Sequence, residues 1–67
     1  MDDGNPRIRQ ANARALEIFE DEKVAAHWIQ TPNVSLGNVA PLILLDSDAG
    51  LRRVLAELSA IEYGLPI

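Results

Sequence analysis

Few side chains in this sequence have the chemistry of a catalytic or metal-binding group. His27 is the only histidine, cysteine is absent, and residues 33–38 lack the preceding strand and following lysine of a phosphate-binding loop. The carboxylates gather at residues 20–22 and in the Asp-Ser-Asp triplet at residues 46–48. Both clusters stand where helices are expected to begin, and such side chains cap helices. We therefore expect no catalytic residue, no metal site and no cofactor.

The composition excludes further classes of function. The 67 residues carry six Lys and Arg against ten Asp and Glu, a formal net charge of −4. Because nucleic-acid affinity depends largely on clustered basic side chains, this scattered set argues against DNA or RNA binding by this chain. The longest apolar run, residues 39–45, is far shorter than the ~20 residues of a membrane span. Without a signal-peptide pattern at the start, we expect a cytoplasmic protein that binds no membrane.

Two helices are predicted in the first half of the chain. Asn5 is a favourable N-cap and Pro6 stands at the first helical position, so the first helix covers about residues 6–20. Asp21 caps a second helix. This helix ends near residue 30, because the following threonine precedes a proline and is pushed towards extended backbone.

The second half is predicted to hold a loop, a short helix and the longest helix. Residues 31–40 have a loop composition, from which Leu36 is expected to enter the core, a role that Val34 could share. Pro41 begins a helix of one or two turns, and the last helix ends at Gly64, the glycine expected after a helix C-terminus. No segment alternates with period two. The predicted fold class is all-α, a small bundle of three to four helices with the longest helix last and a short C-terminal tail.

Hydrophobic residues make up 48% of the chain, more than so small a domain can bury by itself. The residues expected in a common core are Phe19, Trp28, Ile29, Leu36, Pro41, Leu45, Gly50, Val54 and Leu58. Gly50 falls in the first turn of the last helix, where alanine would be more stable. It is expected either to allow the close approach of another backbone or to make a functional contact. The apolar segment 63–67 either packs back on the domain or docks into a partner.

An ordered set of residues resembles a known family. The segment Ala25-Ala26-His27-Trp28-Ile29-Gln30-Thr31-Pro32-Asn33 is followed by Leu36-Gly37, Ala40-Pro41-Leu42, Leu44-Leu45, Gly50, Val54, Leu58, Ile61 and Tyr63-Gly64. Together, over about residues 15–67, they look like the toxin-binding domain of the MbcA/ParS/Xre antitoxins. The chain departs from the family at residues 38–40, where glycine and then threonine are usual before the proline. Ala40 has no side-chain group that can cap the following helix.

The resemblance implies an antitoxin of a type II toxin–antitoxin system. Its partner would be a cognate RES-domain toxin, an ADP-ribosyltransferase-like enzyme that consumes NAD or transfers ADP-ribose from it. The last helix and the tail would occlude the NAD site of that toxin. The residues then expected to bind the toxin are Arg53, Glu57, Ile61, Glu62, Tyr63, Gly64, Leu65, Pro66 and Ile67. The alternative function is an oligomerisation module of a transcriptional regulator.

The same reasoning gives the expected domain organisation. Residues 1–5 are expected to be a disordered N-terminus and residues 6–67 to form the toxin-binding domain. The N-terminal helix-turn-helix domain that family members usually carry is expected to be absent from this chain, so the family's binding of operator DNA is not carried over. A homodimer within a toxin–antitoxin hetero-oligomer is a further expectation.

Overall fold

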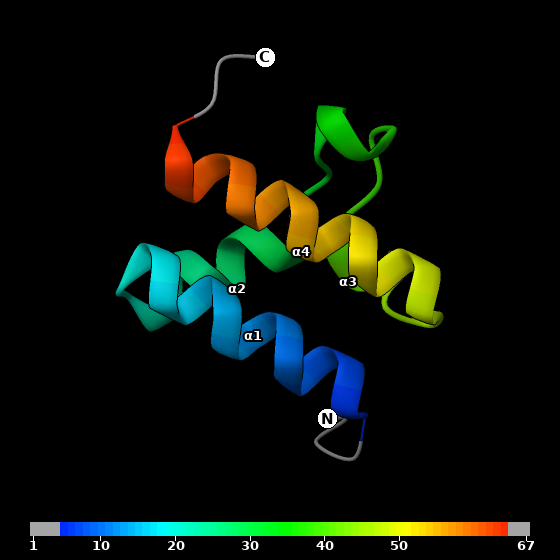
Figure 1. The fold of residues 1–67 in the computed structure, drawn as a ribbon, viewed down its shortest axis with the longest axis horizontal. Coiled ribbons are helices and arrows are strands. Elements are labelled where there is room, and N and C mark those ends of the chain that lie inside the picture. Colours follow the sequence, from blue (N-terminus) through cyan, green and yellow to red (C-terminus); the bar gives the residue numbers. More distant parts are fainter. Residues whose placement is uncertain (1–4, 65–67) are drawn as a thin grey trace.

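The computed structural model describes residues 5–64, which form four α-helices and one 3₁₀ turn. The elements are α1 (Pro6–Phe19), α2 (Glu22–Gln30), η1 (Val34–Leu36), α3 (Pro41–Leu44) and α4 (Asp48–Tyr63). Figure 1 shows α1 and α4 side by side and running in the same direction. α2 and α3 join these two helices on one side, because α1 packs on α2, α2 on α3, and α3 on α4. The all-α fold with its longest helix last confirms the predicted fold class.

Side-chain caps determine where three helices begin, as predicted. The side-chain oxygens of Asn5, Asp21 and Ser47 accept hydrogen bonds from first-turn backbone N–H groups, at 2.9, 2.8 and 3.0 Å respectively. These bonds satisfy donors that have no partner inside the helix. α3 begins without a side-chain cap, because Ala40 precedes it.

α1 ends one residue earlier than predicted. Glu20 is not helical but left-handed, with φ of 58°, and its N–H donates to the carbonyl of Leu16 at 2.8 Å. The chain therefore turns at once into Asp21, the cap of α2, and the two helices meet at a sharp corner. Nothing in the sequence marks Glu20 for this conformation, because glycine or asparagine usually occupies it. At the end of α4, Gly64 adopts this left-handed conformation, with φ of 63°, as predicted for a glycine after a helix C-terminus.

The core lies where the four helices meet, and α1 contributes mainly alanines to it. Ala11 and Ala15 are fully buried, and so are Val54 and Leu58 of α4. Because an alanine side chain is a single methyl group, α1 can pack on α4 at short distance. The interior that results is small and close-packed.

The loop between α2 and α3 is a folded element with η1 at its centre. The N–H of Asn33 donates to the carbonyl of Val39 at 3.1 Å and closes the loop at its base. Leu36 is buried and joins the core, as predicted. Val34 is 82% exposed, so the expectation that it shares this role is wrong. The reason is geometric, since side chains two residues apart in a 3₁₀ turn point in different directions.

The other residues expected in the core lie at the contacts between helices. Those that are buried are Ile29, Pro41, Leu45 and Gly50. Phe19 and Trp28 are half-buried and pack against the core at the junction of α1 and α2. Their ring centroids are 6.1 Å apart and the rings are tilted by 46°, a favourable aromatic arrangement.

α3 and α4 come closest together at Gly50. A Cβ atom at this position would lie 1.7 Å from the carbonyl oxygen of Leu44 and 2.7 Å from its carbonyl carbon. No side chain fits at such distances, so glycine is required for the two backbones to touch. This confirms the expectation that Gly50 allows the close approach of another backbone.

The substitution Gly50→Ala is expected to destabilise the protein, although alanine is intrinsically better in a helix by ~1 kcal/mol. The new methyl group must push α3 away from α4, and overpacking of this kind costs about 1–3 kcal/mol or more. Urea denaturation followed by circular dichroism measures the change. The matched control Ala49→Gly, at an exposed neighbouring position, should cost no more than ~1 kcal/mol. A Gly50→Ala protein as stable as the wild type would contradict the close approach.

An ion pair joins the starts of α1 and α4. Nε of Arg7 donates to Oδ1 of Asp48 at 2.8 Å, across 41 residues of sequence. This hydrogen bond and the positive charge of Arg7 lower the pKa of Asp48 below its ordinary value. Both side chains reach solvent, so the pair aligns the two helix ends more than it stabilises the fold.

The lowered pKa predicts a pH dependence of stability. Because the carboxyl of Asp48 binds protons less readily in the folded state, the pair stabilises the fold above the unfolded pKa. That stabilisation is lost as the pH falls through the folded pKa. Urea denaturation from pH 7 to pH 2 should show the wild type more stable than Asp48→Asn near neutrality, with the difference shrinking as the pH falls below the ordinary pKa of an aspartate carboxyl. Asp46→Asn is the control, because Asp46 forms no ion pair in the described chain. A difference between wild type and Asp48→Asn that does not change with pH would contradict the pairing.

Candidate functional site

One flank of α4 carries three of the residues expected to bind a toxin. Arg53, Glu57 and Ile61 are spaced four residues apart, so they lie in a row along the helix. Arg53 is exposed, Glu57 is half-buried and Ile61 is 38% exposed. The row borders the buried stripe of Val54 and Leu58, which faces the core. A partner on this flank would meet one cation, one carboxylate and one branched apolar side chain.

Glu62 lies on another side of α4 and is held by α1. Its Oε1 accepts a hydrogen bond from Nη2 of Arg14, while Nη1 of Arg14 donates to Oε1 of Glu17 at 3.1 Å. The bond to Glu62 raises the pKa of Arg14 above its usual value, with the charge of Glu62 and the contacts of Glu17 adding to the effect and burial opposing it. The guanidinium therefore stays charged, and the last turn of α4 is tied to α1.

Arg14 is the residue of this site that sequence reasoning missed. It lies 48 residues from Glu62 along the chain, so no local pattern announces their pairing. Its spacing to Glu17 indicates only an ion pair within one helix. Glu62 was expected to contact a toxin, but its carboxylate already pairs with Arg14 of the same chain.

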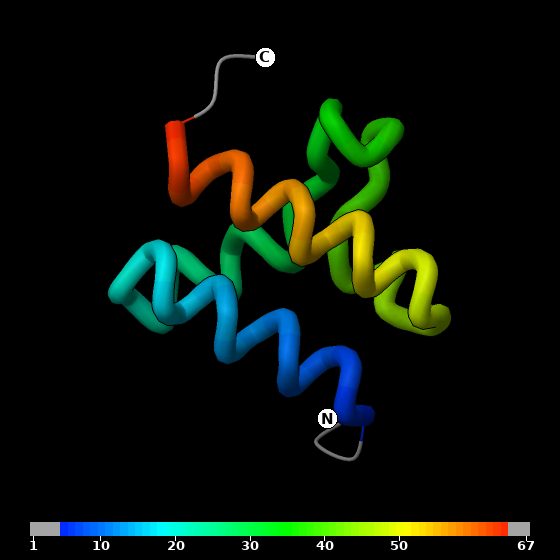
Figure 2. The backbone as a smooth tube through the Cα atoms, viewed as in Figure 1, coloured from blue at the N-terminus to red at the C-terminus, as the bar shows by residue number. Residues whose placement is uncertain are grey.

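The end of α4 presents Tyr63 to solvent. This side chain is 71% exposed, and helical spacing places it away from the flank of Arg53 and Ile61. Gly64 then turns the backbone out of the helix, with its N–H donating to the carbonyl of Ile61 at 3.2 Å. Figure 2 shows this end at the edge of the molecule, beside the end of α1. The remaining site residues, Leu65, Pro66 and Ile67, lie outside the described residues.

The arrangement has the chemistry of a binding surface. Exposed Ile61 and Tyr63 are large side chains of the kind that anchor protein interfaces, and Tyr63 also offers a hydroxyl group. Within residues 5–64, no three His, Cys, Asp or Glu side chains come together as metal ligands. No helix in this range is both long enough and apolar enough to cross a membrane.

Comparison with known proteins identifies the kind of binding surface. Comparisons with curated proteins and with solved structures gave no significant match. Residues 14–64, by contrast, match the family described as the antitoxin Xre/MbcA/ParS C-terminal toxin-binding domain. The matched range begins at Arg14 and includes α2, η1, α3 and α4. The chain therefore belongs to the Xre/MbcA/ParS antitoxin family and carries its toxin-binding domain.

Proposed function

We propose that this chain is the antitoxin of a type II toxin–antitoxin pair and neutralises a RES-domain toxin. In this proposal the end of α4 and residues 65–67 cover the site at which the toxin binds NAD. The observation that carries the proposal is the match to a toxin-binding domain, over a range that ends where α4 ends. The exposed apolar side chains at that end, Ile61 and Tyr63, support it.

The anchoring of α4 at both of its ends supports the proposal. Its first turn touches α3 at Gly50, and its last turn is tied to Arg14 through Glu62. Gly64, at the end of α4, is therefore held at a fixed point of the domain. A binding element that is already positioned loses less conformational entropy when it binds, so more of its contact energy becomes affinity.

The carboxylates of α4 also support the proposal that this end of the helix covers the NAD site of the toxin. An enzyme that binds NAD needs cationic groups for the pyrophosphate, and carboxylates are favourable partners for such groups. Glu57 forms no ion pair with another described residue, whereas Glu62 is engaged by Arg14. We therefore assign Glu57 to a cation of the toxin and Glu62 to the positioning of α4.

The proposal includes several finer statements. The pair acts in the cytoplasm, and this chain itself binds no nucleic acid and needs no cofactor. Two copies form a homodimer within the toxin–antitoxin complex. An oligomerisation module remains the alternative, and loss of the tail separates it from an inhibitor.

Deletion of residues 65–67 is expected to abolish inhibition while leaving every described residue in place. The test combines the purified chain with the RES-domain toxin encoded beside its gene and measures NAD consumption. The full chain should stop NAD loss, and the truncated chain should leave most of it. Circular dichroism must give the same melting temperature for both chains. Full inhibition by the truncated chain would contradict the proposal and favour the oligomerisation module.

Ile61→Ser is expected to weaken toxin binding several-fold, because full burial of an isoleucine side chain contributes about 1.5–3 kcal/mol and 38% of Ile61 is left for a partner to cover. Ile43→Ser is the matched control, since Ile43 is 61% exposed but lies on α3, away from the end of α4. Surface plasmon resonance with immobilised toxin measures both dissociation constants. Equal constants for the two variants would remove Ile61 from the binding site.

A further inference from the structure

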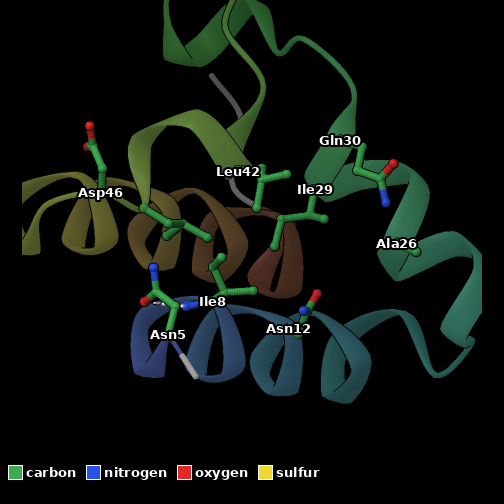
Figure 3. A pocket seen from close by; sticks show the side chains of 9 residues that line it. Asn5, Ile8, Asn12, Ala26, Ile29, Gln30, Leu42 and Asp46 are labelled. Atoms are coloured by element: carbon green, nitrogen blue, oxygen red, sulfur yellow. Dashed lines mark hydrogen bonds between the residues drawn. The ribbon is translucent and has the colours of Figure 1, made fainter. Parts of the chain in front are cut away.

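α1, α2 and α3 enclose an open groove to which α4 contributes no lining residue. Its floor is apolar, with Ile8 from α1, Ile29 from α2, and Leu42 and Leu45 from α3 and its end. Figure 3 shows Ile8, Ile29 and Leu42 pointing towards one another from three different helices. The hollow has a volume of about 580 Å³, enough for several large side chains of a partner.

A second hollow continues the first along the seam of α1 and α2. The two share Asn12 and Ala26 in their linings, and the second extends to Leu16 and Glu22 near the α1–α2 corner. It adds about 250 Å³. We call the two together the seam groove. From Ile8 to Leu16 it follows α1 for ~12 Å, the length of a partner helix of about two turns.

Uncovered apolar surface in the seam groove calls for an occupant with an apolar face. Leu16 is 40% exposed and Leu42 is 39% exposed, although both line the groove. Leu42 lies in the first hollow and Leu16 in the second, so each hollow of the groove has an exposed aliphatic group that a partner could cover. The polar amides of Asn12 and Gln30 stand at its rim and can meet the backbone or polar side chains of the occupant.

The charged residues at the two ends of the seam groove indicate the sign of the charge that an occupant should carry. Asp46 lies at one end and Glu22 at the other, both exposed and both outside the ion pairs of the described chain. None of the described lining residues is Lys or Arg. A helix with an apolar face and basic residues towards its ends would therefore be complementary to the groove in shape and in charge.

The size of stable interfaces connects this occupant with the toxin. A specific complex typically covers about 20–30 residues on each partner. With Glu62 assigned to the positioning of α4, the proposed site on α4 and its tail has eight residues, three of them in the tail, so it is too small by itself. The seam groove reaches Asn12 and Leu16 on one side of α1, and Arg14, which ties α4, lies at the same level on the opposite side of that helix. One partner can therefore cover both surfaces by crossing the end of α1.

We infer that a basic amphipathic helix of the toxin docks in the seam groove, as a second contact separate from the NAD site. This inference rests on the proposed function. The seam groove supplies affinity, whereas the end of α4 and the tail supply inhibition.

A competition experiment tests the shape of the groove. Tagged toxin is co-expressed with equal amounts of wild-type chain and one variant, and intact mass spectrometry of the purified complex gives their ratio. Ala26→Leu places a larger side chain where the two hollows meet, at an exposed helical position that tolerates it. Wild type should exceed Ala26→Leu about tenfold. The control Ala49→Leu, exposed on α4 and outside the groove, should be retained equally with wild type.

The same competition experiment tests the role of the two carboxylates at the ends of the groove. The double variant Asp46→Asn with Glu22→Gln should be underrepresented several-fold at low salt, and this disadvantage should shrink at high salt because screening weakens ionic contacts. Glu20→Gln, an exposed carboxylate outside the groove lining, should compete equally with wild type. Retention of the double variant equal to wild type at low salt would contradict a basic occupant.

The outcomes separate this inference from the proposed function. If wild type binds and inhibits the toxin but Ala26→Leu competes equally with it, the groove inference fails and the proposed function stands. If wild type does not bind the toxin, both fail. If sedimentation shows a wild-type dimer that Ala26→Leu dissociates, with toxin retention unchanged, a second copy occupies the groove and the inference is overturned. Toxin that is retained but not inhibited by the chain without residues 65–67 supports it.

Discussion

The contact between Gly50 and the carbonyl oxygen of Leu44 sets the direction of the longest helix. Because no side chain separates the two backbones, the first turn of α4 has one position against the end of α3. From there α4 runs over the alanine face of α1, where Ala11 and Ala15 leave room for it. Arg14 then fixes its last turn through Glu62. These three contacts together fix the position of Gly64, where the described chain ends.

The same packing explains why a chain rich in aliphatic residues keeps apolar surface exposed. A helix that contributes alanines to the core makes close contacts but encloses little volume, so large side chains elsewhere find no place inside. In so short a domain only about 60% of the surface of the unfolded chain can be buried. Part of the excess lies at two places, the end of α4 with Ile61 and Tyr63, and the seam groove with Leu16 and Leu42. The rest is exposed elsewhere, at Val24, Val34 and Ile43. Exposure of these groups is the physical basis of a binding domain.

Local signals in the sequence predict the elements of this fold well. Asn5, Asp21 and Ser47 lie in capping segments that can be read from residue type, and Gly50 indicates a backbone contact because glycine is unfavourable in a helix. Glu20 could not be foreseen, since its left-handed conformation results from the corner that tertiary packing imposes. Neither could the pairing of Arg14 with Glu62, nor the seam groove, because both depend on how α1 meets other helices. Periodicity identifies the buried stripe of each helix but not which partner covers it.

The free energies of side-chain burial and of protein association favour a division of roles, in which one surface supplies affinity and another supplies inhibition. Burial of the exposed parts of Ile61 and Tyr63 would contribute on the order of 1–2 kcal/mol each, whereas association of two proteins costs about 4–15 kcal/mol in translational and rotational freedom. The described part of the proposed α4 site would therefore bind weakly unless other contacts hold the toxin in place. A partner helix in the seam groove would bury Leu16 and Leu42 together with several side chains of its own. In the proposed complex the tail would then act within a single assembly and compete with NAD at a high effective concentration. A few residues of modest intrinsic affinity would be enough to occlude a nucleotide site.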